Sequence, residues 1–412
     1  MEYVLKNKNI NVLTFEVSAV TTSLKLDSAL PNDTWAEEIK KVNVIVPELL
    51  PLDVKTERIK ESLEKWIKHR KIPKNRQFVE KIVSTYTATG SEQLMDYIDV
   101  SLGLSLNDSF WVTPKNADYR WENFNLYQNK FDEALELVAF TGNSEKIEGI
   151  ISSPEFTTNG MLKKCWHRDG NQIYLYKGSS QEFANGGKEA FSEYYMAQIA
   201  AIMEFDYVPY DLKIFHNQIV SVCPIFTNEN EGYVPMYKIL EKNEETDKWK
   251  SMEKSTLAAT IIKYYDSNKF MDLMLFDSII FNIDRHLGNF GMIINNDTNE
   301  LLRPAPIFDN GFSLLNYLTL GELKDIENWK ITKTSEMGYT FDEQMKLFIG
   351  NRHAHNLEKL TQFEFKKHPQ FNISDEWLEP LQTRIQERAK TALNFINNGV
   401  TQKTTQTRKI RR

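Results

Sequence analysis

The residues best suited to chemistry lie between positions 284 and 309. Four residues separate Asp284 from Asn289, and Asp309 stands 20 residues after Asn289. A carboxylate can orient a hydroxyl nucleophile and accept its proton. An amide oxygen and a second carboxylate can hold Mg²⁺, which binds few protein oxygens because it keeps most of its waters. These residue types predict phosphoryl transfer, with Asp284 as the proton acceptor and with Asn289 and Asp309 as metal ligands.

The segments on either side of this spacing decide whether it indicates a kinase catalytic loop. D-x-x-x-x-N is the spacing of a protein-kinase catalytic loop, but by itself it occurs by chance in most proteins. Here it follows an apolar helical run that ends at Phe281, and two strand-like runs, 291–294 and 305–308, come after it. The second run leads into Asp309-Asn310-Gly311, where other kinases have Asp-Phe-Gly. This order of helix, polar loop, hairpin and aspartate favours kinase chemistry over coincidence.

Upstream residues offer groups that could bind a nucleotide. Gly160 allows the backbone to approach a phosphate, and consecutive N–H groups can line an anion site. Lys177 ends the strand-like run 173–177, the position from which a kinase lysine reaches the α- and β-phosphates. Glu193 lies within an apolar helical run at 188–203, where a carboxylate needs a partner or solvent. The predicted catalytic set is Asp284, Asn289, Asp309 and Lys177.

The combined motifs resemble the HipA-like bacterial serine/threonine kinases. The catalytic loop of that family, N-x-D-x-H-x-x-N, is matched by Asn282, Asp284, His286 and Asn289. Its phosphate-binding loop is similar to TTNGMLKK, in which the recurring hydroxyl, glycine and lysine positions are Thr157, Gly160 and Lys164. The resemblance extends with gaps from about residue 105 to 397. It implies an α+β, two-lobed protein-kinase-like fold with a β-rich N-lobe and a helical C-lobe.

The resemblance also implies an activity and a set of site residues. The activity is ATP- and Mg²⁺-dependent phosphoryl transfer to Ser/Thr hydroxyls of a protein substrate. An ion pair between Lys177 and Glu193 is implied, with Glu189 as a competing partner, and we interpret His286 as holding the loop by packing or hydrogen bonding. The interlobe hinge would offer backbone groups to adenine. The residues expected to contact the nucleotide are Thr157, Thr158, Gly160, Lys164, Lys177, Glu193, Pro224, Ile225, Phe226 and His286.

Self-regulation is a further expectation from the resemblance. In HipA-like kinases the hydroxyl at the Thr157 position can be autophosphorylated. A phosphate there would add about −1.5 to −2 charges beside the ATP phosphates and compete for Lys164, which would switch the enzyme off. The alternative is that Thr157 caps a turn. An antitoxin-like or regulatory partner, as in a toxin–antitoxin pair, stays open. No helix-turn-helix companion that would mark a DNA-binding antitoxin is recognised within this chain.

Two other functions stay open. The loop reads Asp284-Arg285-His286 where typical eukaryotic kinases have His-Arg-Asp, which argues against activation by a phosphorylated loop that docks on the arginine. The same D-R-H-x-x-N string with a later Asp-x-Gly occurs in lipid kinases, so a lipid or small-molecule kinase is one alternative. The other is a scaffold that keeps the kinase fold without the chemistry, although a competent residue type fills every charged role.

The composition is that of a globular protein with an acidic balance. The chain has 412 residues, with 50 Lys and Arg against 57 Asp and Glu, and its net charge is −7. The length predicts two or three domains, and the negative charge argues against a protein that coats nucleic acid. Two cysteines cannot form a disulfide framework, which favours a reducing, cytoplasmic location. No run approaches the roughly 18 apolar residues of a membrane span.

The elements that must position the site fall into four segments. Residues 1–105 contain short strands and a helix and form an accessory α/β region of unknown role. Residues 106–226, with strands around one helix, form the kinase N-lobe and hinge. Residues 227–400 are mainly helical and form the C-lobe with the catalytic loop, and residues 401–412 are a disordered basic tail.

The accessory region contains a basic patch, which consists of Lys68, Arg70, Lys71, Lys74 and Arg76. We interpret this patch as a solvated helix end and turn, because no aromatic residues interleave the charges as a nucleic-acid stacking surface would require. We expect residues 1–105 to recruit a substrate or partner. Their deletion should then leave ATP binding intact.

Overall fold

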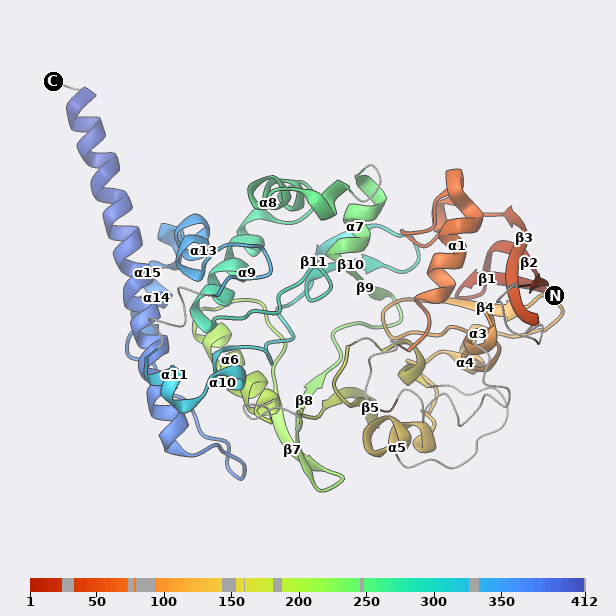
Figure 1. The fold of residues 1–412 in the computed structure, drawn as a ribbon, viewed down its shortest axis with the longest axis horizontal. Helices are drawn as coiled ribbons and strands as arrows, with labels where there is room; N and C mark the ends of the chain where they lie inside the picture. Colours follow the sequence, from red (N-terminus) through yellow and green to blue (C-terminus); the bar gives the residue numbers. More distant parts are fainter. Residues whose placement is uncertain are drawn as a thin grey trace.

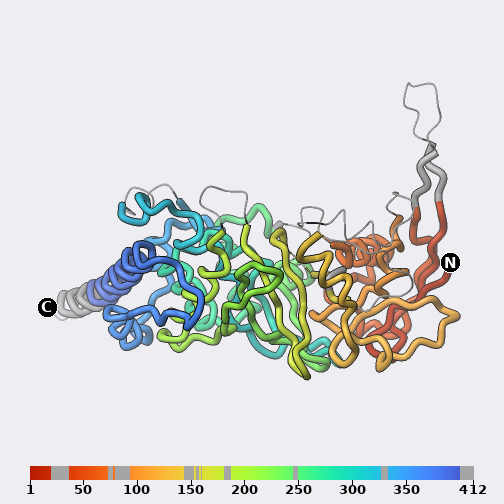
Figure 2. The backbone as a smooth tube through the Cα atoms, turned by 90° about the horizontal axis from the view of Figure 1, so that it is seen from below, coloured from red at the N-terminus to blue at the C-terminus, as the bar shows by residue number. Residues whose placement is uncertain are grey.

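The structure is a computed structural model that describes residues 1–23, 33–72, 78, 93–142, 153–158, 160–180, 187–244, 248–325 and 333–410. These residues form a mixed α+β chain with three antiparallel sheets. The molecule is elongated, with the N-terminal sheet at one end and helix α15 at the other (Figures 1 and 2). In the described part of the chain, no helix is both long enough and apolar enough to span a membrane.

The first sheet takes strands from both sides of the predicted boundary at residue 105. Its order is β3-β2-β1-β4. The strands are β1 (Glu2–Asn7), β2 (Ile10–Ser23), β3 (Asp33–Val44) and β4 (Phe110–Pro114). Leu5 and Val112 belong to one buried cluster with Trp66 of α1 (Ile59–Lys68). Because β4 pairs with β1, the segment predicted to begin the N-lobe belongs to the N-terminal sheet, and a boundary at 105 would cut that sheet.

Short elements follow the first strands and connect the first sheet to the second. They are η1 (Pro47–Leu49), η2 (Thr56–Arg58), α3 (Asp96–Ser101), α4 (Trp121–Phe124), α5 (Glu133–Thr141) and η3 (Pro154–Thr157). Most of residues 77–100 lie outside the described residues, and α3 is a helix in the described part of this stretch. Lys74 and Arg76 of the predicted basic patch also lie outside them.

The second sheet contains the strand predicted at 173–177, which is β6. Its order is β5-β6-β8-β7. The strands are β5 (Lys164–Asp169), β6 (Gln172–Lys177), β7 (Asp211–Phe215) and β8 (Gln218–Pro224). Helix α6 (Glu189–Ile202) is the helix predicted at 188–203. Both α5 and α6 pack against this sheet, and Phe140 of α5 shares a buried cluster with Val222 of β8.

The third sheet has three strands in the order β11-β10-β9. The strands are β9 (Glu231–Pro235), β10 (Gly291–Asn295) and β11 (Leu301–Pro304). The hairpin predicted after the catalytic loop is present, but residues 301–304 form its second strand. The prediction of a strand at 305–308 is wrong, because this apolar segment is buried as a connection and makes only an isolated bridge from Ile307 to Tyr207.

Helices make up most of the remaining chain (Figure 1). They are α7 (Met236–Asn243), η4 (Lys248–Ser251), α8 (Lys254–Ile262), α9 (Ser267–Ile280), α10 (Leu314–Tyr317), α11 (Leu320–Lys324), α13 (Phe341–Phe348), η5 (Asn351–His353), α14 (Ala354–Leu360) and α15 (Asp375–Ile410). Helix α9 is apolar around most of its circumference and is accordingly buried. Helix α15 follows Ser374 and is helical to Ile410, which differs from the expected disordered tail at 401–412.

Candidate active site

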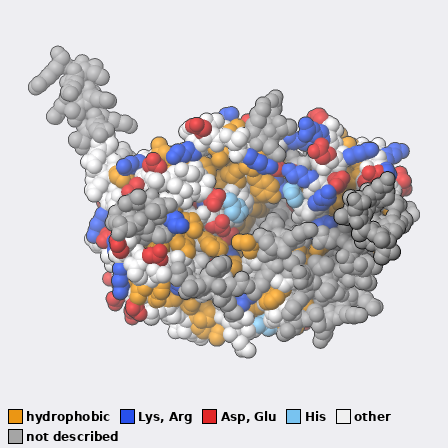
Figure 3. Space-filling view, viewed as in Figure 1, with side chains coloured by type: hydrophobic (Ala, Val, Ile, Leu, Met, Phe, Trp, Pro, Cys, Tyr) orange, Lys and Arg blue, Asp and Glu red, His pale blue; other side chains and the backbone are white. Residues whose placement is uncertain are grey.

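A cavity of about 1190 Å³ borders all three sheets. In the space-filling view the molecule is hollowed near its middle, where hydrophobic side chains lie beside acidic ones and a histidine (Figure 3). All of the predicted site residues line this cavity, although they are spread from Thr157 to Asp309 along the chain. The fold therefore gathers the whole predicted set in one place.

Lys177 lies between two carboxylates. Its ammonium nitrogen is 3.0 Å from Glu193 Oε1 and 2.5 Å from Asp309 Oδ1. The predicted ion pair with Glu193 is therefore present, whereas the competing candidate Glu189 accepts hydrogen bonds from Ser180 instead. Burial disfavours the charge of Lys177, but the two carboxylates outweigh burial and raise the pKa of the ammonium group. Lys177 is thus a fixed cation at the cavity.

The Asp309-Asn310-Gly311 segment is bound to α6. Glu193 Oε2 accepts a hydrogen bond from the backbone N–H of Asn310 at 2.7 Å, and Ser192 donates to the Asn310 carbonyl at 3.1 Å. Asp309 has a φ of 57°, which is uncommon for a residue other than glycine. Its N–H donates to the hydroxyl of Tyr210 at 3.1 Å. Strained backbone of this kind persists where the surroundings hold it in place, as they do here.

The catalytic-loop motif forms a tight turn directly after α9. Phe281, with a φ of 53°, ends the helix, and Asn282 Oδ1 accepts a hydrogen bond from the N–H of Asp284 at 3.0 Å. Asn289 Nδ2 donates to the Asp284 carbonyl at 2.9 Å. Burial and the negative charge of Asp309 raise the pKa of the Asp284 carboxyl. A raised pKa suits a group that accepts a proton during catalysis.

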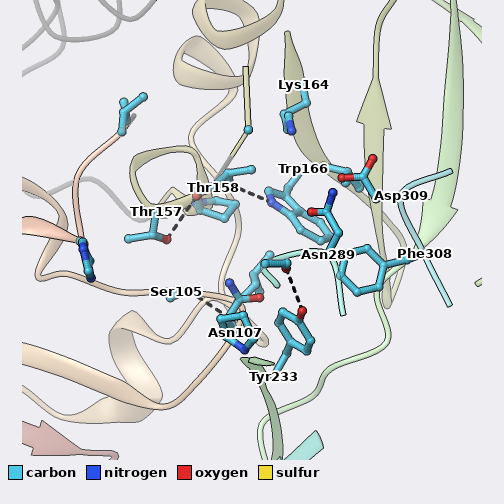
Figure 4. A pocket seen from close by; sticks show the side chains of 18 of the residues that line it. Ser105, Asn107, Thr157, Thr158, Lys164, Trp166, Tyr233, Asn289, Phe308 and Asp309 are labelled. Atoms are coloured by element: carbon cyan, nitrogen blue, oxygen red, sulfur yellow. Dashed lines mark hydrogen bonds between the residues drawn. The ribbon is translucent and has the colours of Figure 1, made fainter. Parts of the chain in front are cut away.

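Asn289 and Asp309 offer oxygen ligands to the cavity (Figure 4). The amide nitrogen of Asn289 is used in the bond to Asp284, so a metal would contact its Oδ1. Burial alone would raise the pKa of Asp309, but Lys177 and Lys164 hold that pKa below its usual range, and the carboxylate is ionised at neutral pH. An amide oxygen and an ionised carboxylate fit Mg²⁺, which needs few protein ligands.

Arg285 joins the catalytic loop to the segment around Asn310. Its guanidinium is 2% exposed and lies 3.1 and 3.0 Å from the two carboxylate oxygens of Asp277. It also donates to the carbonyls of Asn289 and Phe308 and, at 2.8 Å, to Asn310 Oδ1. Because this side chain is buried and fully engaged, it offers no surface on which a phosphorylated loop could dock.

His286 makes a contact of the kind that the sequence analysis expects. Its Nδ1 accepts a hydrogen bond from the N–H of Gly288 at 3.0 Å, within the catalytic loop. The side chain is otherwise exposed at the edge of the cavity. A hydrogen bond within the loop is therefore present, and the role of His286 in holding the loop stays a prediction.

The predicted phosphate-binding loop lies against Lys164. Gly160 has a φ of 99°, and a Cβ at this position would overlap the ammonium group of Lys164. Glycine therefore allows the lysine to lie against the loop backbone. The hydroxyl of Thr157 is buried and donates to the Leu104 carbonyl at 2.9 Å. In this conformation Thr157 is bonded within the protein, which agrees with the turn-capping alternative.

The predicted hinge, Pro224–Phe226, follows β8 and lines the cavity. The N–H of Ile225 donates to the Ile173 carbonyl at 2.9 Å, so this group is already used within the protein. The ring of Phe226 lies 5.3 Å from that of Phe308 and forms an apolar wall with it. The role of this segment in adenine binding stays a prediction.

The cavity also contains residues that the sequence analysis did not select. Trp166 of β5 donates from its indole N–H to Thr158 Oγ1 at 2.9 Å (Figure 4). Arg70 of the predicted basic patch lines the cavity as well, but it is buried and paired with Asp108 instead of solvated as expected. Tyr210 accepts the Asp309 N–H, and Asn107 reaches the cavity from the N-terminal region. No motif marks these residues, because tertiary packing alone brings them to the cavity.

The comparisons with known proteins identify the fold. HipA of Shewanella oneidensis MR-1, from a toxin–antitoxin system and solved with HipB and its operator DNA, matches over 96% of this chain and 98% of that chain. The TM-score is 0.51 at 12% sequence identity. This chain has a HipA kinase fold. The resemblance inferred from the motifs is thereby confirmed for the fold.

A second solved structure matches a smaller part of the chain. The proinflammatory kinase CtkA of Helicobacter pylori covers 60% of this chain and 94% of its own length, with a TM-score of 0.44 and 18% identity. No protein-family model and none of the curated proteins matches the sequence.

Proposed function

We propose that this chain is an ATP- and Mg²⁺-dependent protein kinase that phosphorylates Ser or Thr hydroxyls. The observation that carries the proposal is the position of Lys177 between Glu193 and Asp309, in a cavity that Asp284 and Asn289 also line. A cation for the phosphates, a carboxylate for the acceptor hydroxyl and two oxygen ligands for a metal are what phosphoryl transfer needs. The HipA kinase fold supports the same assignment.

In this proposal the second sheet with α6 is the N-lobe, and the helices from α7 onward form the C-lobe. The nucleotide phosphates would lie near Gly160, Lys164 and Lys177, and the adenine would lie near Pro224–Phe226. The glycine loop with its adjacent lysine suits an anion because both backbone N–H groups and the ammonium group can face it. The apolar wall that Phe226 helps to form suits an aromatic base.

Each side chain at the site has a separate role in the proposed phosphoryl transfer. Asp284 orients the acceptor hydroxyl and takes its proton, which its raised pKa favours. Lys177 holds and neutralises phosphate oxygens. Asn289 and Asp309 would hold Mg²⁺, which would supply positive charge against the negative charge of the phosphate oxygens. Arg285 keeps the catalytic loop and the Asn310 segment in register.

The direct test is transfer of labelled phosphate from ATP in the presence of Mg²⁺. We expect the purified chain to label a protein acceptor, and Asp284→Asn to reduce the rate by about 10²-fold or more, the usual effect of a general base. Asp118→Asn is the matched control because that side chain is 93% exposed and far along the chain from the motif. Parent-like activity in Asp284→Asn would contradict the assignment of the base.

The same assay separates the alternative functions. Lipid and small-molecule acceptors are included, and labelling of these without protein would indicate the lipid or small-molecule kinase. If no acceptor is labelled, a thermal shift with ATP and Mg²⁺ decides between an unidentified acceptor and a scaffold. A nucleotide at 100 times its dissociation constant should add about 2.7 kcal/mol to folding stability.

Regulation by self-phosphorylation belongs to the same proposal. A phosphate of about −1.5 to −2 charges on Thr157 could not remain in its buried position, so the modified loop would move together with Lys164 and lower ATP affinity. Mass spectrometry after incubation with ATP and Mg²⁺ should detect phosphate on Thr157 or Thr158. Unmodified threonines in protein that labels a substrate would contradict this mode of regulation.

A protein partner is part of the proposal by analogy, since HipA was solved together with HipB and operator DNA. Co-purification with proteins from the native source would identify such a partner. Recovery of the chain alone at native concentrations would argue against an antitoxin-like partner.

A further inference from the structure

Polar contacts, of which that of Asn7 is buried, bind the third sheet to the N-terminal unit, which we define as the described residues of 1–114. Asn7 is 1% exposed; its Nδ2 donates to the Asn296 carbonyl at 2.6 Å, and its Oδ1 accepts from Ser109 at 2.6 Å. Asn299 Nδ2 donates to the carbonyls of Glu48 and Leu50 at 3.1 and 2.9 Å. Losing a partner of a buried amide is costly, so these contacts favour one relative position of the unit and the β10–β11 turn.

Strand β9 continues this connection toward the proposed active site. The N–H of Tyr233 donates to the Asn107 carbonyl at 2.7 Å, and its hydroxyl donates to the Gly288 carbonyl at 2.9 Å. Its ring lies edge-on to Phe308, with centroids 5.5 Å apart and an interplanar angle of 87°. Gly288 and Phe308 immediately precede the two predicted metal ligands (Figure 4). Tyr233 therefore contacts the neighbours of both ligands and the N-terminal unit at once.

Two further features support this arrangement. A Cβ at Gly232 would lie 2.5 Å from both the Asn107 carbonyl oxygen and Asn296 Oδ1, so glycine is needed for the close approach of strand and N-terminal unit. Burial raises the pKa of Tyr233 well above its usual value, and the hydroxyl therefore stays a hydrogen-bond donor at physiological pH.

We propose that Tyr233 is a positioning residue for phosphoryl transfer, through which the N-terminal unit fixes the geometry of Asn289 and Asp309. This inference rests on the proposed kinase function. Tyr233 acts through the Gly288 carbonyl and the Phe308 ring rather than on the reacting atoms. It gives the N-terminal unit, which includes residues 1–105, a role in the geometry of the active site besides the expected recruitment of a substrate or partner.

The test uses Tyr233→Phe in the full chain, because this change keeps the ring packing and the backbone bond and removes only the hydroxyl. We expect kcat to fall about tenfold, in line with the loss of one hydrogen bond, while KM for ATP changes little. The Mg²⁺ concentration for half-maximal rate should rise severalfold. Amide hydrogen exchange of residues 284–290 should become faster in the chain without nucleotide. Tyr264→Phe is the matched control, since its hydroxyl bonds Glu244 in the helical region.

A second variant, Gly232→Ala, and the parent chain provide the measurements that separate the positioning role from the kinase function. Gly232→Ala should push the strand from the N-terminal unit and give the same changes in Mg²⁺ dependence and exchange with a larger amplitude. Parent-like kcat, Mg²⁺ dependence and exchange in Tyr233→Phe would refute the positioning role and leave the kinase function intact. A parent that transfers no phosphate and shows no thermal shift with ATP and Mg²⁺ would refute the kinase function, and the exchange rates at 284–290 would then decide the positioning role alone.

Discussion

The site contains two buried groups of cations and carboxylates that differ in their surroundings. The guanidinium of Arg285 is bonded to both oxygens of Asp277 and to three further groups of the protein. The ammonium of Lys177 is bonded to Glu193 and Asp309, and all three line the cavity. The first group is balanced in charge, whereas the second has one more carboxylate than cations.

We therefore interpret the Arg285 group as structural, and we propose that the Lys177 group is functional. A planar guanidinium has donors in fixed directions and suits a permanent junction of several carbonyls, whereas an ammonium group is a compact charge on a flexible stem. The Arg285 group leaves no side open to a ligand. The Lys177 group lines the cavity, where Lys164 also acts on Asp309, so a cation and phosphates that enter the cavity could reach both charges.

The largest effect is expected when the ion pair of Arg285 with Asp277 is broken. Arg285→Ala leaves Asp277 as an unpaired buried charge, and breaking such a pair costs about 3–5 kcal/mol of folding stability. Denaturant unfolding measures this loss. Arg303→Ala is the control, because that arginine forms an exposed pair with Glu231 worth about 0–1 kcal/mol. Equal losses in the two variants would remove the structural role of Arg285.

The second-largest effect is the loss of activity when the ion pairs of Lys177 are broken. Lys177→Met should reduce phosphoryl transfer by about 10²–10³-fold, the usual cost of one preorganised electrostatic contact. The rate of transfer from labelled ATP measures this effect, with Lys115→Met as the control far from the cavity. If the variant stayed as active as the parent, Lys177 would have no functional role.

A smaller effect concerns the acid stability of the two groups. The pKa of Asp309 is lowered in the folded state, so its contribution to stability is present above the unfolded pKa of about 3.9 and is lost as pH falls through the folded pKa. Burial raises the pKa of Asp277 in the folded state, so the contribution of this carboxyl to folding stability increases as the pH falls. Asp309→Asn should therefore lose less stability than the parent between pH 5 and pH 2 in denaturant titrations. An equal or steeper loss would contradict the ionised state of Asp309.

The smallest effect is expected for a residue outside both groups. His286→Ala removes one exposed hydrogen bond to the Gly288 N–H and should cost about 1 kcal/mol or less. Transfer rates should fall only a few fold, with unchanged KM for ATP. A loss as large as that of Lys177→Met would mean that the histidine takes part in the chemistry itself.

Much of the site could be predicted from local sequence. Asp284 and Asn289 lie in one short loop, and the hydrogen bond between them spans only five positions. Helix α6 and strand β6 were predicted because their apolar patterns are local as well. The ion pair of Lys177 with Glu193 followed from the resemblance to a kinase family, since no periodicity pairs these residues.

Contacts between segments that are distant in the sequence could not be predicted from local patterns. Strand β4 looks like any short apolar strand, and only its pairing with β1 assigns it to the N-terminal sheet. Asp277 is buried on an apolar helix, and no local pattern pairs it with Arg285 eight positions later. The bond from Asn7 to the Asn296 carbonyl joins residues 289 positions apart.

The sequence by itself determined the residue types and their local spacing, and these already predicted kinase chemistry and a kinase-like fold. The tertiary structure decided which charges share one cavity and which are used up within the protein. Lys177 and Asp309 are 132 positions apart in the chain, yet their charged atoms are 2.5 Å apart in space. Hydrogen bonds act over about 3 Å and buried charges attract strongly only at similar range, so function depends on distances that spacing along a chain does not encode.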